Sequence, residues 1–183
     1  MWLQLIKRLF GSKKTNSSHD DVKIDYEVKD IQKGFVLEYD MRSWIVKDVA
    51  TYEWDNGVKD LEFTIFDGKD KLFLNYESVD ASISIYWSVQ INSVWPDGKL
   101  KIRKNQGIQD STFSYKGGIY DFFSEASARV KGTKESYNMQ NWVFASNDGN
   151  SFVSFNKYDD SSIDAYAGKK LKEYEISNIF PTK

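Results

Sequence analysis

The chain has 183 residues, a formal net charge of −2, 40% hydrophobic residues and 16% aromatic residues, which is ample material for a folded core. It contains no cysteine and one histidine, His19, so a disulfide framework, a thiolate nucleophile and a multi-histidine metal site are excluded. Mild acidity argues against general nucleic-acid binding, and no apolar run reaches the roughly 18 residues of a membrane span. We therefore expect no nucleic-acid partner, no cofactor and no metal.

The first 14 residues carry a charge of +4 and no acid, whereas the rest of the chain has 21 basic residues against 27 acidic ones. Apolar residues recur here at the spacing of one helical face, and Gly11 follows the last of them. This pattern predicts an amphipathic helix over residues 1–11. The residues predicted to bind a membrane or a partner are Trp2, Leu5, Ile6, Lys7, Arg8, Leu9, Phe10, Lys13 and Lys14.

A helix of this length is marginal in water unless its apolar face is covered. Three surfaces are alternatives: an anionic membrane interface, the protein's own body, or a partner's groove. We rank the membrane interface slightly ahead of docking on the body. Residues 12–30 follow as a linker that is polar in its first part, where His19 is expected to be solvated.

From Ile31 onward the apolar period is two, which is typical of β-strands. Leu61, Phe63 and Ile65 alternate with polar residues, and the segment from Ile83 to Ile91 does the same. Between the strands lie Asp-Gly and similar pairs, such as Asp67-Gly68 and Asn147-Asp148-Gly149, which favour tight hairpin turns. The body is therefore predicted to be all-β and antiparallel.

The body also reads as an internal duplication, with one β repeat at 31–96, a connector at 97–112 and a second β repeat at 113–183. Leu72–Glu77 is matched with Ser151–Asn156, and the only two prolines close the two repeats, in Ser93-Val94-Trp95-Pro96 and Asn178-Ile179-Phe180-Pro181. We predict two repeated antiparallel meanders that form a sandwich or barrel. The predicted core comprises Trp44, Leu72, Leu74, Ile83, Ile85, Trp87, Phe152 and Ile179. A basic cluster in the connector, Lys99, Lys101, Arg103 and Lys104, is interpreted as a solvated loop, with an anionic-partner site as the alternative.

The order of these features resembles the bacterial domain-of-unknown-function family 4178, over roughly Gly34 to Pro181. The matching motifs are Gly34-Phe35-Val36, Trp44-Ile45-Val46, Leu72-Phe73-Leu74 with Tyr76-Glu77, Tyr86-Trp87, Phe113–Gly117, Tyr120, Glu125-Ala126, Ala167-Gly168 and Ile179-Phe180-Pro181. The second half departs from the pattern because Asn156 stands where the first half, as matched above, has Glu77. Such domains often occur beside genes for phage-shock-type membrane-coating proteins and aminopropyltransferase-like proteins. The resemblance implies a membrane-stress setting, and it supplies no catalytic residue.

Catalysis would have to rest on carboxylates, because the sequence has no Ser-His or Cys-His arrangement in its body. The candidate pairs are Glu53 with Asp55, Glu77 with Asp80, and Asp159-Asp160 with Asp164. With 27 acids in the chain, such pairs are expected by chance, and we interpret them as solvated strand faces. The segment from Asp159 to Asp164 has oxygen ligands for a hard cation but lacks the EF-hand glycine and glutamate, so it is interpreted as an acidic turn.

A binding module fits the composition better than an enzyme does. The strand-end aromatics Trp54, Trp95, Trp142 and Tyr158 are candidates to line a cleft or an interface, although most of the tryptophans are expected in the core. We expect a non-enzymatic binding or adaptor protein with a protein partner, cytoplasmic and peripheral at the inner face of the membrane. The alternatives are a soluble protein-binding module such as an immunity-type inhibitor, and a carboxylate-based hydrolase.

Overall fold

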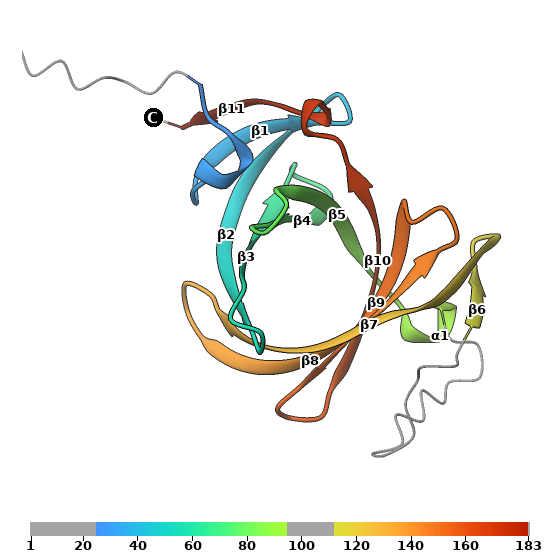
Figure 1. The fold of residues 1–183 in the computed structure, drawn as a ribbon. Coiled ribbons are helices and arrows are strands. Elements are labelled where there is room, and N and C mark those ends of the chain that lie inside the picture. Colours follow the sequence, from blue (N-terminus) through green and yellow to red (C-terminus); the bar gives the residue numbers. More distant parts are fainter. Residues whose placement is uncertain (1–24, 95–111, 183) are drawn as a thin grey trace, which may run out of the picture.

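The computed structural model describes residues 25–94 and 112–182 (Figure 1). In the first half, the 3₁₀ helix η2 (Val28–Asp30) precedes β1 (Phe35–Tyr39), β2 (Arg42–Trp54), β3 (Lys59–Phe66), β4 (Lys71–Glu77), β5 (Ser82–Val89) and the short helix α1 (Ile91–Val94). The second half has β6 (Thr112–Tyr115), β7 (Gly118–Lys131), β8 (Ser136–Ser146), β9 (Ser151–Tyr158), β10 (Ile163–Leu171), the 3₁₀ helix η4 (Glu173–Glu175) and β11 (Ile176–Pro181). The prediction of an all-β fold is confirmed.

The strands form one antiparallel sheet in the order β11-β1-β2-β3-β4-β5-β10-β9-β8-β7-β6. An additional pairing of β2 with β7 joins the sheet to itself, so the eight strands from β2 to β5 and from β7 to β10 form a closed ring (Figure 1). β1 and β11 extend the sheet beyond β2, and β6 extends it beyond β7. Closure leaves no unpaired strand edge within the ring. Unpaired edges can pair with other chains and cause aggregation, and a closed barrel avoids this.

The two halves are related by a pseudo-two-fold axis that is visible in the strand register. Where the halves meet, Tyr86 is the equivalent of Tyr166, and Ser88 is the equivalent of Gly168. Tyr86 lies opposite Gly168 and Tyr166 lies opposite Ser88, so the symmetry converts one pair into the other. The β2–β7 pair has the same property, and both of these strands carry a bulge, between Val46 and Asp48 in β2 and between Phe122 and Ser124 in β7. The repeated meanders of the sequence prediction are therefore present.

Two details of the predicted duplication are wrong. Leu72 lies opposite Ile65, and its equivalent in the second half is Val153, which lies opposite Phe144. The predicted matching paired Leu72 with Ser151, so the matching of Leu72–Glu77 with Ser151–Asn156 is displaced by two residues. The displacement arises because the β8–β9 connection is two residues longer, with six residues between the partners Ala145 and Phe152 and four between the partners Phe66 and Lys71. The closing segments also differ, since Val94 ends a helix and Ile179 lies in strand β11.

Most hydrophobic side chains gather in two cores on the outward face of the ring, each completed by the other half of the chain. A smaller third cluster, Tyr52, Ala128, Val130 and Met139, joins the halves where β2 pairs with β7. The first core, which includes Trp44, Phe63 and Leu74, is covered by η2, β1 and β11, and it receives Leu171 and Ile176 from the second half. The second core, around Trp142, Phe144 and Phe155, receives Trp87 and Val94 from the first half. Neither half encloses its core alone.

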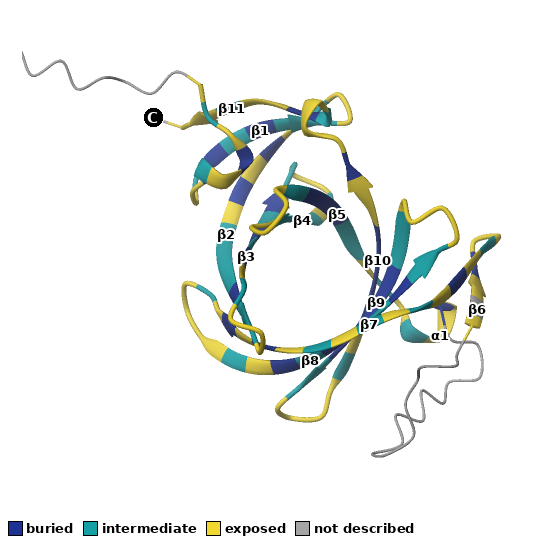
Figure 2. Ribbon diagram, in the orientation of Figure 1, coloured by how far each residue is buried: buried dark blue, intermediate teal, exposed yellow. Residues whose placement is uncertain are grey.

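Half of the predicted core is buried: Trp44, Leu74, Ile83 and Ile85. The other four residues, Leu72, Trp87, Phe152 and Ile179, are only partly buried. Figure 2 shows that buried, intermediate and exposed positions are interspersed along the strands. Phe152 points to the inward face of the ring, beside Gly168 on β10, and Ile179 lies on the outermost strand β11, where one side of the sheet has no neighbour.

Candidate binding groove

The inward face of the ring carries buried polar groups among aromatic and apolar side chains, whereas a solvent-facing polar side was the sequence-based expectation for strands such as 61–65. Glu62 accepts hydrogen bonds from the hydroxyl groups of Tyr52, at 2.6 Å, and Tyr86. Burial raises the pKa of Glu62, and burial together with the Glu62 charge raises the pKa of both tyrosines. The second half has a counterpart in the 2.6 Å bond from Asn141 to Asn156.

This inward network has the character of a structural core rather than a reactive site. Among the residues that the structure describes, no buried side-chain nitrogen or oxygen lacks a hydrogen-bond partner. The Tyr158 and Tyr166 hydroxyl groups lie 3.1 Å apart, and Trp54 donates to Asp60 at 2.6 Å. Satisfied buried networks specify one arrangement of a core, and we assign that role to the Glu62 cluster.

A groove of about 420 Å³ lies on the outer face of the ring, over β2, β7, β8 and β9. Strand register arranges its outward side chains in two rows. The first row is Glu53, Arg129, Asn138 and Asp159, and the second is Asp55, Ser127, Gln140 and Lys157. Ala128, Met139 and Tyr158 lie between these positions on the same strands and complete the lining, although they pack in the inward cluster with Tyr52 and Val130. The floor is thus four strands wide and carries charges of both signs.

The charges of the groove differ in how far they are already neutralised. Glu53 lies between Lys131, at 2.7 Å, and Lys59, at 3.0 Å, and hydrogen bonds to these two lysines lower the pKa of Glu53 to about 2. Asp159 accepts a 2.9 Å hydrogen bond from the backbone N–H of Asn138. Within residues 25–94 and 112–182, neither Arg129 nor Lys157 forms an ion pair. These two cations are therefore available to an added acidic group.

The first half fills the position that is a groove in the second half. Register makes Leu61 the equivalent of Gln140 and Tyr76 the equivalent of Lys157. Leu61 and Tyr76 pack against the first core, whereas Gln140 and Lys157 stand on the floor of the groove. Two apolar-to-polar differences between the duplicated halves thus lie at one place.

The carboxylates singled out in the sequence occupy separate settings. Glu53 and Asp55 lie in the groove, and Asp80 and Asp160 each accept the amide of the residue two positions on, Ser82 and Ser162, as in a turn. Asp164 accepts a bond of 3.3 Å from the Tyr166 hydroxyl group. In the described part of the chain, no three histidine, cysteine or acidic residues are grouped so as to hold a metal ion.

The other predicted site residues fall in three classes. The amphipathic segment, Trp2 to Lys14, lies outside the described residues, as do Trp95 and the basic cluster from Lys99 to Lys104. Trp142 is buried, whereas Tyr158 lines the groove. Sequence reasoning missed Arg129 and Lys157. For Lys157, the signal is the replacement of Tyr76 at the matched position, which requires the correct alignment of the two halves. Arg129 has no such signal, because its equivalent in the first half is the charged residue Glu53.

No helix in the described ranges is both long and apolar enough to cross a bilayer. The chain is 29% identical over 180 residues to an uncharacterized protein of Aquifex aeolicus (strain VF5), with 98% of each chain covered. No solved structure matches the chain. Residues 32–173 match the family described as "Domain of unknown function (DUF4178)", and the chain belongs to that family.

Proposed function

We propose that this protein is a non-enzymatic adaptor that binds an extended, polar segment of a partner protein in the groove over β7, β8 and β9. The observation that supports the proposal is the groove itself, present where the duplicated half places Leu61 and Tyr76. Small-molecule sites are mostly apolar, whereas this floor is formed by eight polar or charged side chains in two rows. Charge pairing of that kind fixes the register of a bound segment.

Arg129 and Lys157 are the expected anchors for acidic side chains of the partner, and Asp55 offers the opposite charge. Glu53 contributes to the charge pattern but is a poor general acid, because two lysines hold its pKa at about 2. This favours the adaptor over the carboxylate-based hydrolase.

We place the adaptor in the cytoplasm, at the inner face of the membrane, on the basis of its first 14 residues. Each basic residue close to an anionic lipid surface contributes about 1 kcal/mol, and the segment has four. Attachment of this kind is reversible and weakens with added salt. Flotation with anionic vesicles at two salt concentrations tests it, and binding should be lost when residues 1–14 are deleted.

Photo-crosslinking in the native cells tests the groove. A photoreactive amino acid replaces Asn138 in the groove or, as a control, Glu173, an exposed residue of η4 outside the groove. We expect a partner adduct from position 138 that is absent from position 173. The adduct should disappear with Lys157→Glu and persist with Lys116→Glu, a charge change in the exposed β6–β7 turn. Equal adducts from positions 138 and 173 would exclude the groove as the binding site.

A further inference from the structure

A partly exposed apolar row crosses four neighbouring strands of the first half. Phe180 on β11, Val36 on β1, Ile45 on β2 and Phe66 on β3 lie directly opposite one another in register. Phe180 is 48% exposed and Ile45 is 40% exposed, whereas Val36 and Phe66 are partly buried. Neither the groove nor the two cores include these four residues.

The fold itself does not require this row, because the second half lacks it. The register equivalents of Val36, Ile45 and Phe66 are Thr112, Asp121 and Ala145. The apolar row therefore distinguishes the half that follows the amino-terminal segment from the half that does not.

The amino-terminal segment joins the described chain at β1, which carries Val36 of the row, but on the opposite face of that strand. The ring of Tyr26 packs edge-on against Phe35, with the ring centres 5.2 Å apart, and Phe35 is the neighbour of Val36 and the register partner of Pro181. The chain between residues 11 and 24 reaches up to about 45 Å when extended. Residues 2–10 can therefore reach any point of the row.

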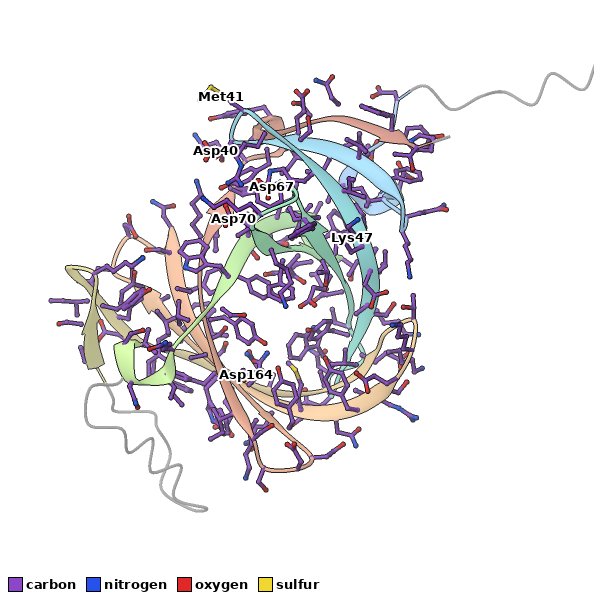
Figure 3. The ribbon with its side chains drawn as sticks, turned by 180° about the vertical axis from the view of Figure 1, so that it is seen from behind. Asp40, Met41, Lys47, Asp67, Asp70 and Asp164 are labelled. Carbon is purple, nitrogen blue, oxygen red and sulfur yellow. The ribbon has the colours of Figure 1, made fainter. Side chains whose placement is uncertain are left out.

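We propose that the apolar face of residues 2–10 docks on this row, in the same molecule. Nine helical residues are about 13 Å long, and four adjacent strands span about 14 Å. The carboxylates Glu38 and Asp48 lie on the same face as Ile45, on either side of the row, and complement Lys7 and Arg8. One cation also borders the row, since the Lys47 amine lies 5.8 Å from the centre of the Phe66 ring (Figure 3).

Docking on the row and attachment to a membrane use the same helical face, so each excludes the other. The docked form is expected away from anionic lipid, and the released form on it. This consequence rests on the proposed membrane attachment, whereas the docking itself does not. Release of the helix also exposes Ile45 and Phe180 only where the protein is already on a surface.

The absence of cysteine allows a direct test by disulfide trapping. The full chain with Leu5→Cys and Ile45→Cys is compared with Leu5→Cys and Asp121→Cys, in which the second position is the symmetry equivalent of Ile45. Under mild oxidation, the first pair should close an intramolecular disulfide at least about tenfold faster, because docking raises the effective concentration of the two thiols. Phe180→Asp in the first pair should remove that advantage. Equal rates for the two pairs, or a disulfide between two molecules, would overturn the proposal.

Vesicles separate this proposal from the membrane attachment. Added phosphatidylglycerol vesicles should slow closure of the Leu5–Ile45 pair if the helix leaves the row for lipid. Fast closure that vesicles do not change would support docking and contradict the membrane attachment. Slow closure without vesicles, equal to that of the control pair, would overturn docking whatever the vesicles do.

Discussion

Among the described glycines, Gly168 is predicted to be the one at which substitution by alanine lowers the free energy of unfolding most. It lies on β10 between Tyr86 of β5 and Phe152 of β9. An added Cβ would lie 2.5 Å from Phe152 Cζ, 2.6 Å from Tyr86 Cβ and 2.7 Å from the Ile85 carbonyl oxygen. The Phe152 ring tip can turn away, but the Tyr86 and Ile85 atoms are fixed by the β5–β10 pairing.

The expected cost follows from two opposed effects. Overpacking a tight site costs about 1–3 kcal/mol and sometimes more, and a collision with backbone belongs at the upper end of that range. Alanine recovers about 0.5–1 kcal/mol of the entropy penalty of a glycine within a strand. We expect Gly168→Ala to lower the free energy of unfolding by about 2–3 kcal/mol, and the melting temperature by about 4–12 °C for a chain of this length.

Urea and thermal unfolding of Gly168→Ala test the reasoning, with Ser88→Ala as the matched control. Ser88 is the symmetry equivalent of Gly168, opposite Tyr166, and it is exposed, so its change should stay within about 0.5 kcal/mol. A Gly168→Ala variant as stable as the wild type would refute the claim that the ring has no room at β10.

Three further predictions concern stability, each measured by urea unfolding. Trp142→Ala should lower the free energy of unfolding by about 3–5 kcal/mol, because the Trp142 side chain is only 2% exposed. Trp87 is partly buried, so Trp87→Ala should lower it by less, and equal losses would contradict this. Met41→Gly should stabilise the fold by roughly 0.5–1 kcal/mol, because Met41 is fully exposed at the β1–β2 hairpin tip (Figure 3) with a φ of 57°. Burial raises the pKa of Glu62 above its ordinary 4.5, so the contribution of this carboxyl to stability falls as the pH rises through the raised pKa. The stability of Glu62→Gln relative to the wild type should therefore increase with pH. A difference that stays constant with pH would contradict the assignment.

Local pattern was sufficient to predict the strands, the turns and the repeated order. It was not sufficient to predict that β2 pairs with β7 and β5 with β10, because such pairings join residues far apart in the chain. The unpredicted long-range pairings also explain why the inward face was predicted to be exposed to solvent. Glu62 alternates with Leu61 and Phe63 like a solvent-facing residue, and only closure of the ring buries it.

The groove was predictable in part, since Glu53, Asp55 and Tyr158 were singled out beforehand. Their grouping with Arg129 and Lys157 depends on the pairing of β2 with β7 and of β8 with β9, which brings four strands into one floor. No spacing along the chain encodes that neighbourhood.

The mutual completion of the two cores has a consequence for how the protein is made. β1 needs β11 as its second neighbour, and Phe35 finds its register partner only in Pro181. During synthesis the first core, which contains Trp44 and Phe63, therefore stays open until Leu171 and Ile176 have left the ribosome. Long-range pairing of this kind slows folding and exposes strand edges to aggregation, so the nascent first half is the stage at which a chaperone would be needed most.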